Sequence, residues 1–172
     1  MERKSVRNGF LVFAAFALMF APVFATTLVS TAAAPKTLHV HGIWSLSSFN
    51  STVLKTVGNI QYGAGVGVGP LTGGIHGSTG GTYLTRYNMK TQVILFTVSI
   101  VCKCTVDGRS GTLWISGTNG IDHNASDPNG KTTANLAIVG AQGGLKGITG
   151  TGRFVTTTSS NDMNYTMTVT LP

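Results

Sequence analysis

The chain has 172 residues, enough for one domain and a short appended segment. After residue 25 it carries nine Lys and Arg against four Asp and no Glu, and the basic residues are scattered. Because no basic cluster is interleaved with aromatic residues, the composition disfavours a nucleic-acid-binding protein. The positive charge is consistent with a protein that is soluble at an anionic cell surface.

The N-terminal segment has the layout of a secretory signal peptide. Basic residues at its start precede an apolar run over 9–21, and Val23-Phe24-Ala25 places small residues where a signal peptidase cleaves. The sequence therefore predicts a signal peptide over 1–25, a linker over 26–36 and one domain over 37–172. Such a protein is secreted or otherwise extracytoplasmic.

Two alternatives for this segment stay open. Residues 10–29 contain no charged residue and are long enough to span a bilayer, so an uncleaved segment would anchor the protein in the membrane. Arg7-Asn8-Gly9-Phe10 also weakly resembles a pilin-type cleavage site, although Ala14 stands where an acidic residue is expected. In every case the N-terminal segment is the only predicted contact with a membrane.

The rest of the chain alternates apolar and polar residues with the period of two that half-buried β-strands show. After residue 35 no stretch keeps a helical apolar period, and glycine and threonine are frequent. In chain order, the first two predicted strands cover 38–46 and 52–62, and a glycine-rich hairpin over 63–81 follows, whose second strand continues to 87. The remaining predicted strands cover 92–106, 110–118, 132–139, 152–158 and 164–171. About eight antiparallel strands with short turns can close into a small barrel and remove its edges. The predicted fold class is therefore all-β, with a single closed antiparallel barrel.

The most specific local prediction is a β-hairpin in the middle of the chain. Apolar residues share one face of the strand over 92–106, and Asp107-Gly108 follows it at once. Asp-Gly is a preferred two-residue hairpin turn because both residues adopt positive φ there. The partner strand then covers 110–118.

Cys102 and Cys104 lie on the apolar face of this strand. Residues two apart on an extended strand have Cα atoms roughly 6.5 to 7 Å apart, which is at the limit of disulfide geometry. We interpret the pair first as two buried thiols. A local disulfide is the alternative, which export would favour and a bulge at Lys103 would permit.

Two segments in the second half of the domain resemble a known family. They are Val106-Asp107-Gly108-Arg109-Ser110-Gly111-Thr112-Leu113 and the glycine-rich stretch 138–154, which reads IVGAQGGLKGITGTGRF. With a closing strand over 165–171 they resemble an uncharacterised bacterial and archaeal family, a domain of unknown function with an allene-oxide-cyclase-like barrel. The resemblance covers mainly residues 106–172 and implies an eight-stranded antiparallel barrel. Plant cyclases and dirigent proteins with similar barrels hold a hydrophobic substrate in the lumen, but the acidic positions that the family shows near its first strand are not matched here.

His39 and His41 lie two apart on the first predicted strand and therefore share a face. They could supply two ligands to a metal ion, with His76 or His123 as the third. The alternative is an exposed polar face near the start of the domain. No other cofactor site is predicted.

Asn124-Ala125-Ser126 fits the glycosylation sequon in a predicted loop, so Asn124 is a candidate modification site. No catalytic residue is predicted. The four Asp lie in predicted turns, where Asp is favoured, and Glu2 lies in the N-terminal segment. The chain also contains no Gly-x-Ser-x-Gly motif.

Two functions follow from these observations. The first is an exported, non-enzymatic barrel that acts as a binding or surface-interaction module, with an anionic cell-surface component as its partner. The second, implied by the resemblance alone, is a barrel that holds a small apolar ligand in its lumen as a cyclase or isomerase does. An open lumen lined by converging polar groups would favour the second function, and a lumen filled by side chains would favour the first.

Overall fold

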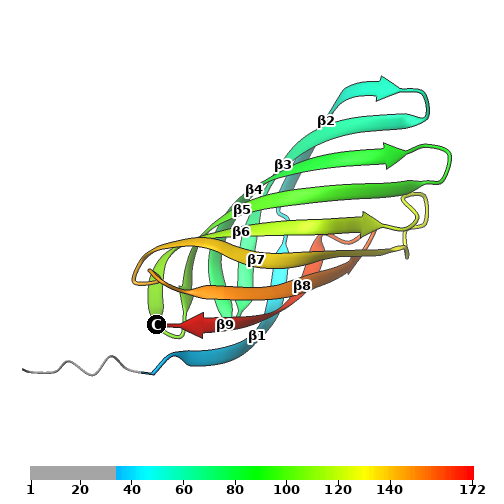
Figure 1. Ribbon diagram of the computed structural model, residues 1–172. Coiled ribbons are helices and arrows are strands. Elements are labelled where there is room, and N and C mark those ends of the chain that lie inside the picture. The colour runs from blue at the N-terminus through cyan, green and yellow to red at the C-terminus, as the bar shows by residue number, and fades with distance from the viewer. Residues whose placement is uncertain (1–33) are drawn as a thin grey trace, which may run out of the picture. The chain divides into compact units, whose positions relative to one another are not determined.

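The computed structural model describes residues 34–172, which form nine antiparallel strands and no helix (Figure 1). The predicted signal peptide over 1–25 and the alternative anchor over 10–29 lie outside these residues. Within residues 34–172 no helix is long and apolar enough to span a membrane. The strands are β1 (Lys36–Ser45), β2 (Ser48–Val57), β3 (Ile60–Gly73), β4 (Ile75–Asn88), β5 (Val93–Val106), β6 (Arg109–Asp122), β7 (Lys131–Gly143), β8 (Thr149–Thr157) and β9 (Asp162–Leu171).

Eight of these strands close into a barrel, which confirms the predicted fold class. The sheet order is β1-β9-β8-β7-β6-β5-β4-β3-β2, and β1 also pairs with β3. This closing seam is short, because it joins only Gly42, Ile43 and Trp44 of β1 to Thr72 and its two neighbours on β3. The ninth strand, β2, continues along β3 outside the closed ring.

The prediction of one strand over 52–62 is wrong. A turn at Gly58 and Asn59 divides this stretch into the end of β2 and the start of β3. The two strands form an antiparallel hairpin, in which Val57 lies opposite Ile60 next to the turn. Gly58 has a φ of 58°, a conformation that glycine adopts without steric cost. The period-two pattern runs through both strands without a break, so alternation alone did not reveal the turn.

The two predicted hairpins are present. The glycine-rich stretch forms β3 and β4, which meet at Gly73 and Gly74. β5 and β6 join at Asp107 and Gly108, whose φ values of 51° and 76° are those that a two-residue hairpin turn requires.

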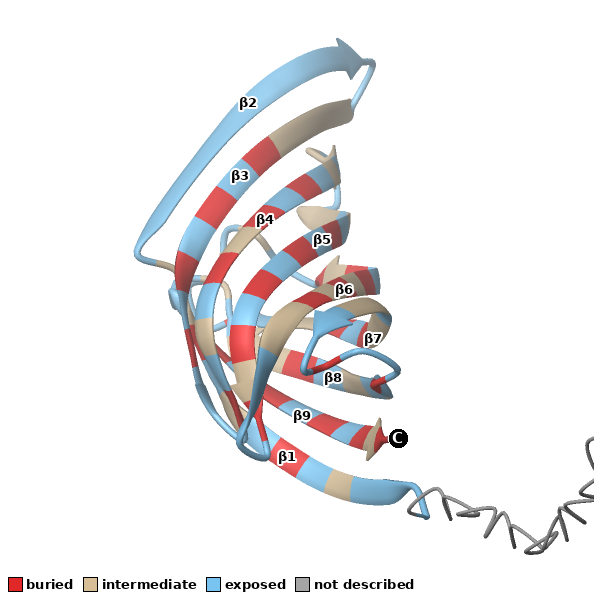
Figure 2. Cartoon of the chain, turned by 90° about the vertical axis from the view of Figure 1, so that its left-hand side faces the viewer, coloured by how far each residue is buried: buried red, intermediate tan, exposed pale blue. Residues whose placement is uncertain are grey.

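The interior of the barrel is filled with side chains. Buried and exposed residues alternate along β3 to β9, as the banding in Figure 2 shows. The inward residues are large and apolar, and the remaining cavity of about 20 Å³ has room for about one water molecule. Nine side chains line it: Trp44, Leu71, Ile75, Ile100, Ile115, Leu136, Phe154, Tyr165 and Met167.

Tyr165 reinforces the short seam between β1 and β3. Its hydroxyl accepts a hydrogen bond from the backbone N–H of Ile75 at 3.0 Å and lies within hydrogen-bond distance of two carbonyl oxygens, those of Thr72 at 3.0 Å and Ile75 at 2.9 Å. The ring reaches these groups by passing over Gly42, where an added Cβ would lie 2.6 Å from the Tyr165 hydroxyl oxygen. One side chain from β9 thus connects the β3–β4 hairpin to the rest of the ring.

Candidate functional site

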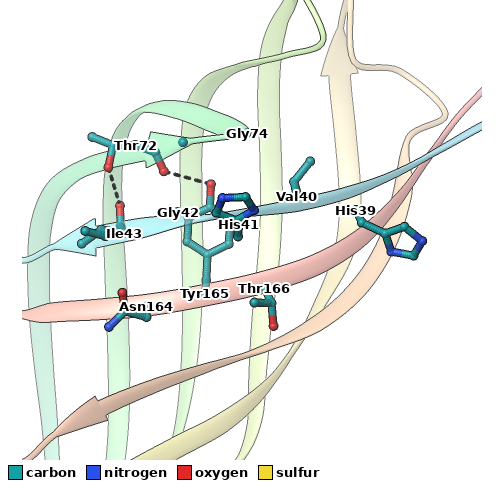
Figure 3. Close-up of a pocket in the computed structure, with 11 residues that line it drawn as sticks. His39, Val40, His41, Gly42, Ile43, Thr72, Gly74, Asn164, Tyr165 and Thr166 are labelled. Atoms are coloured by element: carbon teal, nitrogen blue, oxygen red, sulfur yellow. Dashed lines mark hydrogen bonds between the residues drawn. The ribbon is translucent and has the colours of Figure 1, made fainter.

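The two predicted metal ligands lie on the outer surface of β1. His39 and His41 are both exposed and do share a face, opposite the buried Val40 and Trp44. A ring nitrogen of His39, Nδ1, lies 3.1 Å from the Thr168 hydroxyl on β9. Figure 3 shows the His41 ring beside Gly42 and the His39 ring farther along the strand.

The other two histidines do not join them. His76 lies on β4 and His123 follows β6, and both are exposed. Within residues 34–172 no group of three His, Cys, Asp or Glu side chains is placed to hold a metal ion. The metal site at His39 and His41 therefore stays a prediction, without a third protein ligand from the described part of the chain.

Cys102 and Cys104 are both buried and face the barrel interior. The structure joins them as a disulfide, with Cα atoms 5.4 Å apart. This separation is shorter than a regular extended strand gives and lies within the range that disulfides use. The two cysteines thus belong to the core, and neither is placed to act at the surface.

Asn124 is exposed in the loop between β6 and β7. Its side-chain oxygen accepts hydrogen bonds from the backbone N–H of Ser126 at 3.3 Å and from the Ser126 hydroxyl at 2.8 Å. Glycosylation at this position stays a prediction. The preceding Asp122 is buried and accepts a hydrogen bond from the Thr158 hydroxyl, so this carboxylate fixes the loop to the β8–β9 turn.

Two depressions on the outer surface meet at His39, Val40 and His41. The larger, of about 750 Å³, lies between β1, the β3–β4 turn and β9 (Figure 3). The smaller, of about 380 Å³, lies over β1, β9, β8 and β7. We call the two together the β1–β9 groove.

Strand register assembles the polar side chains of this groove. Arg153 on β8 pairs with Thr166 on β9, and Thr166 pairs with His41 on β1. Asn135 on β7 lies on the other side of Arg153. Cross-strand partners share a face, so these four residues form one row on the outer surface, with Arg153 and His41 on strands roughly 10 Å apart.

The β1–β9 groove is positively charged. None of its lining residues is Asp or Glu. The nearest carboxylate on this face of β9 is Asp162, four residues before Thr166, which is roughly 13 Å along a strand. Among residues 34–172 the one ion pair is Lys36 with Asp107, so Arg153 has no carboxylate partner there. The groove therefore offers one guanidinium, two imidazoles and several hydroxyl and amide groups to an anion.

Local sequence could not have revealed this row. Asn135 and Arg153 come from the consecutive strands β7 and β8, whereas His41 lies on β1 at the other end of the domain sequence, and only the register of β7, β8, β9 and β1 aligns them. The sequence indicated that His39 and His41 share a face, but nothing near Arg153 marked it as their neighbour.

The buried tyrosines offer no reactive group to this surface. Burial raises the pKa of Tyr165, and the hydrogen bond from the Ile75 N–H partly offsets the rise. Burial also raises the pKa of Tyr83, whose hydroxyl has no hydrogen-bond partner among residues 34–172. Both phenols thus stay protonated at neutral pH.

The fold and sequence of this chain are similar to those of known proteins of unknown function. A crystal structure of a protein of unknown function from the DUF3224 family of Shewanella oneidensis MR-1 matches with a TM-score of 0.61 and 15% identity, covering 80% of this chain and 98% of that one. No curated protein matches the chain in sequence. The family model DUF3224, described as a protein of unknown function, matches residues 47–169. The resemblance to a domain of unknown function with a barrel fold is thereby confirmed, and the chain belongs to the DUF3224 family.

Proposed function

We propose that this chain is exported and that its barrel acts as a non-enzymatic binding module for an anionic group, such as a sulfate, phosphate or carboxylate of a cell-surface polymer. The observation that carries the proposal is the row of Arg153, Thr166 and His41 in a groove without a carboxylate. Guanidinium and imidazolium groups donate charge-assisted hydrogen bonds to such oxygens.

The alternative function, in which the lumen handles a small apolar ligand, has less support. The lumen holds a cavity of only about 20 Å³, whereas ligand pockets usually measure a few hundred Å³. An apolar ligand would have to displace side chains such as Trp44 or Phe154. The outer groove needs no such rearrangement.

Binding to a sulfated polymer tests the groove. We expect Arg153→Gln to weaken binding to dextran sulfate about ten-fold, because one charge-assisted hydrogen bond contributes roughly that much. Arg86→Gln is the matched control, since Arg86 is also exposed on the outer face but lies on β4. Isothermal titration at about 0.15 M salt, with neutral dextran as the second ligand, measures both variants. Equal losses for the two variants would mean that net charge alone drives binding, and would contradict the proposal.

Export is tested separately on protein isolated from its host. The Val23-Phe24-Ala25 site predicts a mature N-terminus at Thr26, which N-terminal sequencing detects directly. Intact 1–25 in a membrane fraction would contradict cleavage and favour the anchor.

A further inference from the structure

Among residues 34–172, the outer edge of β2 pairs with no other strand. β1 pairs with β9 up to Ser45 and Asp162, and beyond this point the chain leaves β9 and continues as β2 along β3. In the described part of the chain, β2 therefore pairs with β3 only. All ten of its residues are exposed, and Figure 2 shows it as the outermost strand of the sheet. A row of backbone N–H and C=O groups thus lies open along its free side.

This edge is also apolar. Four of its large side chains are more than half exposed: Phe49 at 52%, Val53 at 54%, Leu54 at 62% and Val57 at 61%. On β3 and β4, Val66, Val68 and Leu84 are exposed as well, on the face that carries Val57, whereas Phe49 and Val53 lie on the other face, opposite Gly67 and Gly63. Exposed apolar residues on neighbouring strands mark an interaction site.

β2 carries only two of the usual protections of a free edge, one lysine and one bulge. Natural edge strands prevent pairing with another chain by lysines, prolines, inward-pointing charges or bulges, and the bulge of β2 lies between Val53 and Lys55. β2 has no proline and one charged residue, Lys55, whose ammonium group lies 4.8 Å from the centre of the Tyr62 ring on β3. Phe49 packs edge-on against Tyr83 of β4, with ring centroids 5.4 Å apart, so the strand is held in place. The edge is thus ordered and open to an added strand.

We propose that β2 pairs in an antiparallel manner with β2 of a second copy of this chain. The charge distribution favours a second copy at this edge. Residues 36–162 carry nine basic and four acidic side chains, so two copies repel one another over most of their surface. β2 contributes only Lys55 to that charge. Two copies that meet at β2 therefore bring few positive charges close together.

The sequence of β2 is compatible with its own two-fold pairing. Its register with β3 shows which residues share a face, with one irregularity between Val53 and Lys55. When a two-fold axis passes through Thr52, each residue of one β2 strand lies opposite a residue of the other β2 strand that points to the same face of the sheet. The resulting pairs are Thr52 with Thr52, Ser51 with Val53, Asn50 with Lys55, Phe49 with Thr56 and Ser48 with Val57.

This register also separates the two positive charges. Each Lys55 faces Asn50 of the other copy, and the two Lys55 lie about four residues apart along the ladder, roughly 13 Å. That distance exceeds the Debye length of about 8 Å at physiological salt. The pairing uses strands other than those of the β1–β9 groove, so it is independent of anion binding.

Two glutamate substitutions on β2 test the pairing and its register. Both Thr52→Glu and Asn50→Glu add one negative charge to the same face, at exposed positions two residues apart. Thr52→Glu places two carboxylates opposite each other at the axis and should weaken the dimer at least about ten-fold, whereas Asn50→Glu faces Lys55 and should strengthen it about three-fold. Sedimentation velocity of the chain as purified from its host, at about 1 to 100 µM, measures both.

The outcomes separate the proposal from its competitors. Wild-type protein that stays monomeric to about 100 µM overturns it and leaves the β2 edge to a different chain. A dimer that both glutamates weaken equally, or that neither changes, also overturns it, because the contact would then lie elsewhere or in another register. Circular dichroism of each variant excludes misfolding as the cause, and Thr52→Ser should dimerise like the wild type.

Discussion

Gly42→Ala is expected to destabilise the barrel by about 3 kcal/mol, which lowers its melting temperature by roughly 10 °C. Gly42 is the one residue that pairs with both Gly73 on β3 and Tyr165 on β9. A Cβ there would lie 1.8 Å from the carbonyl oxygen of Thr72 and 2.6 Å from the Tyr165 hydroxyl oxygen. Because backbone cannot yield as a side-chain end does, the seam must open by a comparable distance. Thermal denaturation followed by circular dichroism measures the loss.

Gly80→Ala is the matched control for this prediction. Gly80 also lies within a strand of the barrel, but the nearest atom to an added Cβ is Val68 Cγ1 at 3.9 Å, an ordinary contact. Its melting temperature should stay within about 2 °C of the wild type, or rise slightly because alanine restricts the unfolded chain. Equal melting temperatures for the two variants would show that the β1–β3 seam contributes little to stability.

Trp44→Ala is expected to cost about 4 kcal/mol, the typical loss for removing a large aromatic side chain from a core. Trp44 is 2% exposed and lines the interior cavity. Its indole N–H donates a hydrogen bond to the Thr79 hydroxyl at 2.7 Å, and that hydroxyl donates to the Gly69 carbonyl at 2.7 Å. The substitution therefore removes both packing and the donor to Thr79. Urea denaturation should show a lower midpoint with an unchanged slope.

The enlarged cavity gives this variant a second measurable property. Added indole should raise its melting temperature, because a ligand that binds only the folded state stabilises it. Trp114→Ala is the control, since Trp114 is only half-buried on the outer face of β6 over Gly140 and should cost about 1 kcal/mol without rescue by indole. A loss for Trp44→Ala no greater than for Trp114→Ala would contradict a tightly filled lumen. If Trp44→Ala fails to fold, Trp44→Phe should show about half the loss.

The sequence predicted the regular parts of the barrel because they depend on local chemistry. The period of two along β5 to β9 follows from burying one face of each strand, and Asp107-Gly108 marks a turn through its own backbone preference. The turn at Gly58 and Asn59 was missed, since neighbouring strands of like pattern leave no change in periodicity between them. The predicted bounds of β2 and β3 were therefore wrong, because the strand over 52–62 joins the second half of β2 to the start of β3.

The candidate site depended much less on local chemistry. That His39 and His41 share a face follows from their spacing on one strand. Their proximity to Arg153 does not, because it rests on the register of β8 and β9 and on the long-range pairing of β9 with β1. The grouping of Val57 with Val66 and Leu84 likewise depends on which strand borders which.

The amino-acid sequence by itself thus determined an all-β domain with inward apolar faces, a positive charge and a family of barrel proteins. The tertiary structure alone decided that the ring closes through Gly42, Ile43 and Trp44, that the lumen is filled, and that β2 keeps a free edge. The physical reason is that strand pairing joins residues dozens of positions apart, and its register depends on packing across the whole sheet. A pattern within one strand records which side of it is buried, but not which strand lies beside it.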